Sequence, residues 1–181
     1  HYLSDEMPQS RIPGMADPKR KKNKPRGRAA LSNPSGRYER HQHIPLDDGW
    51  NGLDPDPNPI RTTVTPEVTR SIIARNDSPD VPFDQSINPY KACEHGCIYC
   101  FARPTHAYLG LSPGLDFESR IFSKPNAPAL LERELARPNY QCDVLALGAN
   151  TDPYQPVERR LKLTRRILEV LSKYEHPVSI V

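Results

Sequence analysis

Three cysteines lie within eight residues of the chain, in the run Cys93-Glu-His-Gly-Cys97-Ile-Tyr-Cys100. Thiolates spaced four and three residues apart on a loop can converge on one metal centre. Soft sulfur ligands favour an iron–sulfur cluster or zinc over cations that prefer oxygen. Three ligands would leave one iron of a four-iron cluster open to a small molecule. Zinc stays an alternative, because His95 or His106 could complete its four ligands.

A second group of polar residues lies in the loop from Gly148 to Pro156. This loop follows residues 142–147, an apolar run that predicts a buried strand. Asp152 could bind a ligand or help to start the helix that follows, and Glu158 would stabilise the first turn of that helix through the helix dipole. Because the active sites of α/β folds gather at the carboxyl ends of strands, this loop and the cysteine loop are both candidates.

The elements that would carry these loops alternate between strand and helix from residue 66 onward. Apolar runs and helical periodicity predict strands over 83–88, 117–124, 142–147 and 178–181, and helices over 127–137 and 157–173. This alternation predicts an α/β fold with parallel strands, either the opening of a barrel or an open sheet. Cys142 is interpreted as an ordinary buried residue of its strand. The last run resembles an interrupted strand with an unpaired edge, so we expect an incomplete and poorly soluble protein.

Residues 1–65 differ in composition from the rest of the chain. They are polar and rich in proline, and residues 15–40 hold nine Lys and Arg against two acidic residues. Because such a segment has no apolar face to bury, we predict a disordered or extended basic segment before a domain at 66–181. Its charge could bind nucleic-acid phosphates, although solvated basic tails are common. We expect a cytoplasmic protein without a membrane span, because no apolar run is long enough and clustered cysteines suit a reducing compartment.

The motif C-x-x-x-C-x-x-C, with the aromatic Tyr99 before its last cysteine, resembles the signature of the radical S-adenosylmethionine (SAM) superfamily. The run from Gln85 to Arg103, together with Asn150-Thr-Asp-Pro-Tyr-Gln-Pro156, is similar to a bacterial branch related to spore photoproduct lyases and described as DNA repair photolyase-like. The resemblance covers residues 66–181. Ala149 stands where spore photoproduct lyases carry a hydrogen-donating cysteine, so the resemblance does not imply repair of thymine dimers.

The resemblance implies a partial radical SAM (βα) barrel whose family pattern continues past Val181. It implies that Cys93, Cys97 and Cys100 hold a 4Fe-4S cluster and that Tyr99 lies near the adenine of SAM. The residues implied for the SAM amino group and ribose are Gly148, Asn150, Thr151 and Asp152. One-electron reduction, from a donor such as flavodoxin or ferredoxin, would cleave SAM to methionine and a 5'-deoxyadenosyl radical that abstracts hydrogen from the substrate. The resemblance identifies neither the substrate nor a catalytic side chain.

Two hypotheses of other classes remain open. One is a nucleic-acid-binding protein whose cysteines hold structural zinc, and the other is an iron–sulfur protein that serves as an electron carrier or sensor. Arg103, directly after the cysteines, could meet anionic groups or pack on Asp116 or Glu118. Metal content separates the zinc hypothesis from the others, and SAM cleavage separates the enzyme from the electron carrier.

Overall fold

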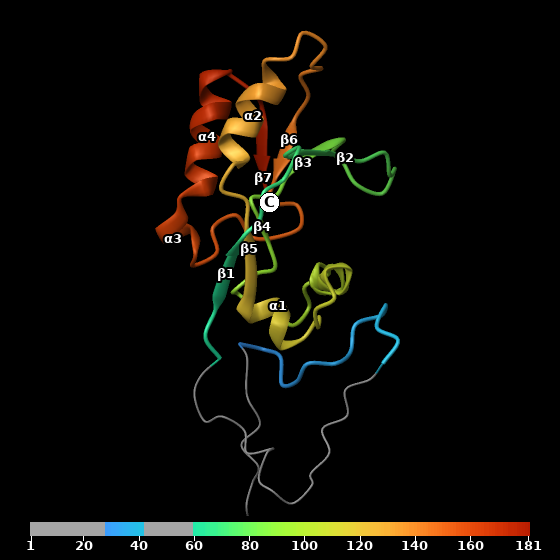
Figure 1. Cartoon of the computed structure of the whole chain (residues 1–181). Helices are drawn as coiled ribbons and strands as arrows, with labels where there is room; N and C mark the ends of the chain where they lie inside the picture. The colour runs from blue at the N-terminus through green and yellow to red at the C-terminus, as the bar shows by residue number, and fades with distance from the viewer. Residues whose placement is uncertain (1–27, 42–59) are drawn as a thin grey trace, which may run out of the picture.

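Two small β-sheets organise residues 28–41 and 60–181, the part of the chain that this computed structural model describes (Figure 1). One sheet has the order β1 (Thr63–Pro66), β5 (Arg120–Ser123), β4 (Tyr90–Lys91), and the other has the order β2 (Ile73–Arg75), β3 (Gln85–Ile87), β6 (Leu145–Leu147), β7 (Val178–Ile180). The pairs β1–β5, β3–β6 and β6–β7 are parallel, whereas β2–β3 and β4–β5 are antiparallel. The predicted α/β class is confirmed, with mixed sheets that form no closed barrel among the described residues.

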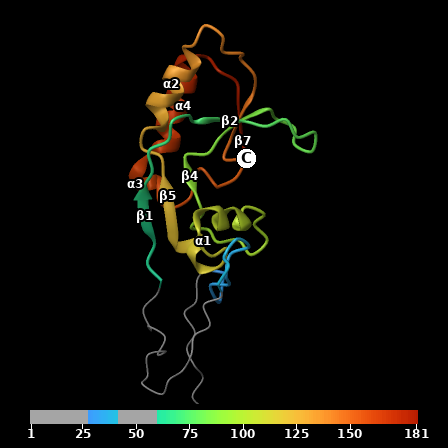
Figure 2. The same cartoon turned by 45° about the vertical axis from the view of Figure 1, so that its right-hand side comes forward.

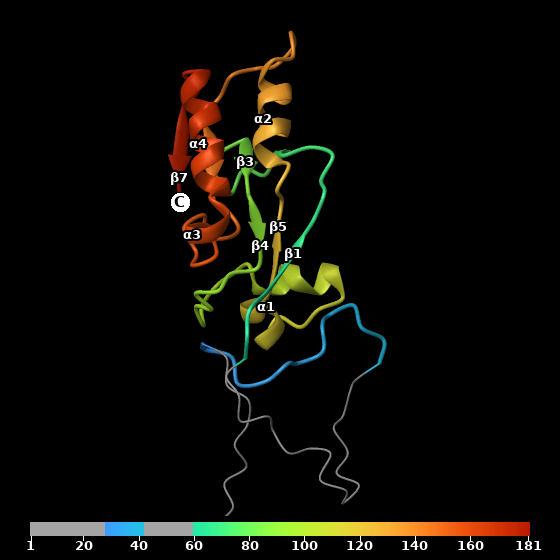
Figure 3. The same cartoon turned by 60° about the vertical axis from the view of Figure 1, so that its left-hand side comes forward.

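The larger core lies between the four-stranded sheet and two helices, α2 (Ala127–Leu135) and α4 (Leu163–Lys173). Figures 1 and 3 show these helices side by side. Each helix turns an apolar stripe toward the strands, as residues at helical spacing do. The fully or nearly fully buried members of this core are Ile72, Ile87, Ala127, Leu130, Leu131, Leu145, Leu147, Ile167 and Leu171. This packing holds the carboxyl ends of β3 and β6 at a fixed place.

A second core lies under the cysteine loop. It combines residues of β4, the short helix α1 (Leu115–Ser119) and β5 with the segment that leads into α4. Its buried members are Tyr90, Ala92, Cys93, Ala102, Phe117, Ile121, Val157 and Leu163. One of the three motif cysteines is therefore a core residue. The 3-10 helix η1 (Arg103–Leu109) follows the loop and packs beside α1.

Three local predictions are wrong. The strand predicted over 117–124 is in fact divided: residues 117–119 end α1, and only residues 120–123 form a strand, β5. The helix predicted over 157–173 is broken into α3 (Glu158–Leu161) and α4, because Lys162 takes a left-handed conformation with φ of 52°. Cys142 is exposed and lies before β6 begins, so it is not a buried strand residue.

Part of the predicted N-terminal segment packs on the domain. Residues 28–36 contain no helix or strand, yet they lie along α1, as Figure 2 shows for the blue segment. The N–H of Leu115 donates to the carbonyl of Ser32 at 3.2 Å, and Asn33 and Asp116 exchange two hydrogen bonds of 2.9 Å. The strand β1 also starts three residues before the boundary predicted at residue 66. Of the basic run over residues 15–40 that was predicted to meet nucleic acid, residues 15–27 with six of its nine Lys and Arg lie outside the described residues, as do residues 42–59 of the predicted extended segment.

Within residues 28–41 and 60–181, no helix is long and apolar enough to cross a membrane.

Candidate metal centre

The cysteine loop begins where β4 ends and is built from successive turns. Ala92 has φ of 68°, and the N–H of Cys93 donates to the carbonyl of Phe117 at 3.2 Å, which anchors the loop to α1. The N–H of Gly96 then donates to the carbonyl of Cys93, and the N–H of Cys100 to the carbonyl of Cys97, each at 3.2 Å. Tight turns therefore bring all three cysteines onto one short loop between β4 and η1.

The three thiols of this loop differ in their surroundings. Cys93 is buried, Cys100 is half-buried and Cys97 is exposed. Burial is the main cause that raises the pKa of the Cys93 thiol, and the nearby charges of Asp152 and Cys100 raise it further. Hydrogen bonds from the backbone N–H groups of His95 and Asp152 lower the pKa in part. Among the described residues, no group of three or more His, Cys, Asp or Glu side chains is arranged so that it could hold a metal ion. The loop thus carries the thiols on one segment without bringing them to a common point.

The loop from Gly148 to Pro156 is attached to the cysteine loop by two side chains. Gln155 is completely buried; its Oε1 accepts from the N–H of Glu94 at 3.0 Å, and its Nε2 donates to the carbonyl of Ala92 at 3.2 Å. The Oγ1 of Thr151 donates to the carbonyl of Tyr90 at 3.1 Å. Because these bonds satisfy buried backbone groups on both sides of Cys93, they hold the two predicted site loops together.

The polar residues predicted to bind SAM lie along this attachment. Asp152 faces His95, with 3.2 Å between Oδ2 and Nε2, and both side chains are partly exposed. The N–H of Asn150 donates to Oδ1 of Asn88 at 2.8 Å. Gly148 has φ of 87°, and a Cβ there would lie 2.4 Å from a ring carbon of Pro153, so only glycine fits this turn.

Tyr99 is the predicted site residue that the structure leaves apart from the others. Its side chain is 86% exposed, and its neighbours Ile98 and Phe101 are also exposed. The cysteine loop therefore presents three large apolar side chains to solvent, whereas Thr151 and Asp152 lie close to Cys93. Exposed apolar side chains on one turn form a surface that a ligand or a further part of a protein can cover.

Two pairs of buried polar residues support the site, and sequence reasoning missed the first of them. The hydroxyl of Tyr90 donates to Glu158, whose carboxylate also accepts from the N–H of Leu163 at 3.0 Å. Arg103 pairs with Glu118 at 2.6 Å, which was one of the partners considered for this arginine. No local pattern indicates the first pair, because its members are 68 residues apart.

Comparisons with known proteins give relatives without a described activity. The chain is 46% identical to uncharacterized proteins of Mycobacterium bovis and Mycobacterium tuberculosis over 101 residues, which cover 56% of this chain and 30% of each relative. It is 29% identical to an uncharacterized protein of Methanocaldococcus jannaschii over 87 residues, covering 48% of this chain and 30% of that protein. The chain thus spans about 30% of the length of the curated relatives it matches. No family model and no solved structure matches it.

Proposed function

We propose that the protein is a radical SAM enzyme whose Cys93, Cys97 and Cys100 hold a 4Fe-4S cluster. The observation that carries the proposal is the attachment of the three-cysteine loop to the Gly148–Pro156 loop through Gln155 and Thr151. The second loop follows β6, whose parallel neighbour β3 leads into the cysteine segment, so both loops lie at the end of the sheet where α/β enzymes bind ligands.

The donor set fits an iron–sulfur cluster. Three thiols on one loop suit a cluster with one open iron, and sulfur ligands suit iron, while His95 of the same loop lies against Asp152. The buried Cys93 would supply a fixed ligand, and the exposed Cys97 would have to approach the other two thiols on binding. The bound cofactors would supply a 5'-deoxyadenosyl radical by reductive cleavage of SAM.

The residues of the chain would bind and orient SAM beside the cysteine loop. Gly148, Asn150, Thr151 and Asp152 are proposed for its amino group and ribose, because their loop is hydrogen-bonded to Tyr90 and Ala92, just before Cys93. The exposed ring of Tyr99 is proposed to cover the adenine and exclude water from it. An electron donor such as flavodoxin or ferredoxin is a proposed partner, and nucleic acid is a proposed substrate class.

Metal analysis after anaerobic reconstitution with iron and sulfide tests this function. We expect iron and acid-labile sulfide in the purified protein, and loss of both in Cys97→Ala. Cys142→Ala is the matched control, because Cys142 is equally exposed but lies outside the loop, so it should retain the cluster. Zinc in place of iron, or equal iron in all three proteins, would contradict the proposal.

A further inference from the structure

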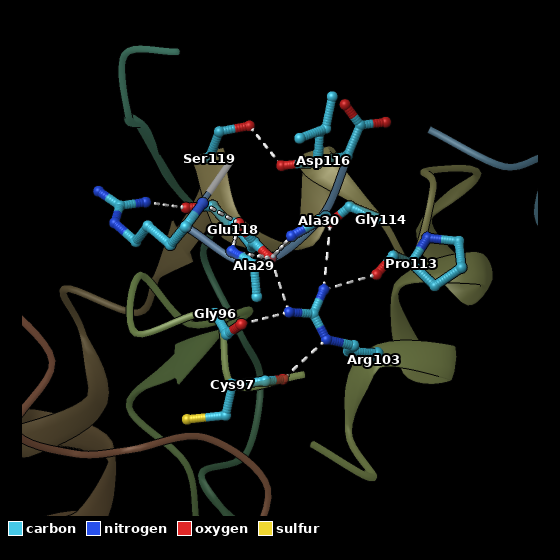
Figure 4. A network of polar contacts seen from close by, with 12 residues as sticks. Ala29, Ala30, Gly96, Cys97, Arg103, Pro113, Gly114, Asp116, Glu118 and Ser119 are labelled. Carbon is cyan, nitrogen blue, oxygen red and sulfur yellow. Dashed lines mark hydrogen bonds and ion pairs between the residues drawn. The ribbon is translucent and has the colours of Figure 1, made fainter. Parts of the chain in front are cut away.

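The guanidinium of Arg103 is bonded to the backbone of the cysteine loop itself. Its Nε donates to the carbonyl of Cys97 at 2.9 Å, and Nη2 donates to the carbonyl of Gly96 at 2.5 Å. On its other side, Nη1 donates to the carbonyls of Pro113 and Gly114 at 3.1 and 3.4 Å. Figure 4 shows these bonds around one planar group. Arg103 thus ties the turn between two motif cysteines to the segment that precedes α1.

Glu118 holds the guanidinium in this position. Its Oε1 lies 2.6 Å from Nη2 of Arg103, and the side chains are only 1% and 13% exposed, respectively. Burial raises the pKa of Glu118, but Arg103 and the backbone N–H groups of residues 28–30 outweigh that effect, so the pKa lies below its usual value. The pair is therefore a buried and fully hydrogen-bonded ion pair, which is costly to break from one side.

Residues 28–30 close the opposite side of Glu118. The N–H groups of Arg28, Ala29 and Ala30 donate to its carboxylate at 2.5, 3.1 and 2.8 Å. The side chain of Arg28 also donates to the Glu118 carbonyl at 2.6 Å and contacts Glu94 of the cysteine loop at 3.4 Å. Residues 28–30 of the predicted basic segment are thus part of the support of the cysteine loop.

We propose that Arg103 is a positioning residue for the metal centre, with Glu118 and residues 28–30 as its support. This inference rests on the proposed function. By holding the carbonyls of Gly96 and Cys97 on one side of the loop, Arg103 leaves the Cys97 sulfur on the other side, as Figure 4 shows. A planar guanidinium can serve two adjacent carbonyls and a carboxylate at once, whereas a lysine cannot offer this fixed geometry.

The test compares Arg103→Lys with Arg103→Ala and with the control Arg165→Lys. Lysine at 103 keeps the charge beside Glu118 and should preserve the fold, even where Arg103→Ala does not. The control changes an exposed ion pair with Glu169, in which both side chains are more than 60% exposed. Two measurements are made on each protein: amide exchange of residues 94–100 without metal, and electron paramagnetic resonance (EPR) of the reduced, reconstituted protein.

For Arg103→Lys we expect amide exchange about tenfold faster in residues 94–100 but unchanged in α2 and α4, because loop hydrogen bonds are lost locally. We also expect an altered EPR spectrum and removal of iron by a chelator about ten times faster than in the control. Exchange and spectrum both equal to those of the unmodified protein would overturn the proposal and leave the radical SAM function intact. If exchange is faster in Arg103→Lys but none of the proteins takes up iron, the proposed function has failed. The role of Arg103 as a positioning residue for a metal centre is then overturned with it.

Discussion

Gly96 has no room for a side chain at the centre of the cysteine loop. It has φ of 61°, and a Cβ would lie 2.8 Å from the carboxylate carbon of Glu118 and 3.1 Å from Cβ of Arg28. Gly110 is a matched control, because its φ is 68° but nothing lies within 4 Å of the added atom. We expect Gly110→Ala to cost about 1 kcal/mol of unfolding free energy for the left-handed backbone alone.

Gly96→Ala should cost about 1–3 kcal/mol more than Gly110→Ala, because the buried carboxylate cannot move away without losing Arg103. Urea denaturation of the two variants measures this difference. Equal unfolding free energies for both would show that the contact of Gly96 with Glu118 does not constrain the loop.

His106 makes the free energy of unfolding depend on pH. Its ring is buried against Phe117 and Phe122, and its Nε2 has no hydrogen-bond partner among the described residues. Burial lowers the pKa of His106 from 6.5 to about 4, while the charge of Asp116 acts against this shift. Between these pH values the unfolded chain binds the proton and the folded chain does not. The contribution of His106 to stability is therefore complete above pH 6.5 and is lost as the pH falls toward 4.

We expect the unmodified protein to lose about 1–2 kcal/mol more stability between pH 7 and pH 5 than His106→Phe does. Unfolding free energies of both proteins at the two pH values measure this difference, and the comparison removes the contribution of carboxylates that titrate in both. The same loss in both proteins would contradict a neutral, buried His106.

At the level of elements, Glu158 joins β4 to the start of α4. Its carboxylate accepts from the hydroxyl of Tyr90 and from the N–H groups of Leu163 and Arg165, at 3.0 and 3.2 Å for the two backbone groups. Burial is the largest cause that raises the pKa of Tyr90, and the hydrogen bond to Glu158 raises this pKa further. The carboxylate therefore caps α4 after the break at Lys162 and satisfies a buried hydroxyl.

Glu158→Ala should lower the unfolding free energy by about 2–4 kcal/mol, because it leaves Tyr90 without a partner and removes the cap. Glu169→Ala, which breaks an exposed pair with Arg165, should cost less than about 0.5 kcal/mol. Thermal or urea unfolding of both variants provides the comparison. Similar small losses would contradict the role of Glu158 as a link between the elements.

The elements that sequence reasoning predicted well are those with strong apolar patterns. The cores of β3, β6, β7, α2 and α4 lie inside the ranges predicted for them, because continuous apolar runs and helical stripes are local signals. By contrast, β1 is short and exposed and depends on pairing with β5, more than 50 residues later. The helix α1 depends on contacts with residues 32 and 33, which no local pattern in residues 115–119 indicates.

The candidate site shows the same division between local and distant signals. The spacing of Cys93, Cys97 and Cys100 predicts a metal centre from the local sequence alone, and the polar residues after β6 predict the second loop. The contacts that join the loops, through Gln155 and Thr151, link residues about 61 positions apart. Such contacts are set by the packed fold, so sequence reasoning could place both loops at one end of the sheet but not identify what joins them.

At the scale of the whole molecule, β7 is the outer strand of the four-stranded sheet. Among the described residues it pairs only with β6, and Ile180 and Val181 are 46% and 70% exposed. An unpaired edge with exposed apolar residues favours pairing with another chain. We expect a chain of these 181 residues to self-associate as its concentration rises, and Ile180→Lys to reduce this association. Sedimentation velocity over a concentration series measures it, and a monomer at every concentration would contradict the expectation.

The proposed radical SAM function requires a cluster that binds SAM at the cysteine loop. The most direct test is EPR of the anaerobically reconstituted, dithionite-reduced protein, recorded with and without SAM. We expect a cluster signal that shifts when SAM is added, since the open iron is where SAM would bind. This signal should be absent from Cys97→Ala. A cluster signal unaffected by SAM would contradict the radical SAM function and favour an electron carrier, and a protein that holds zinc without any iron signal would contradict the iron–sulfur centre itself.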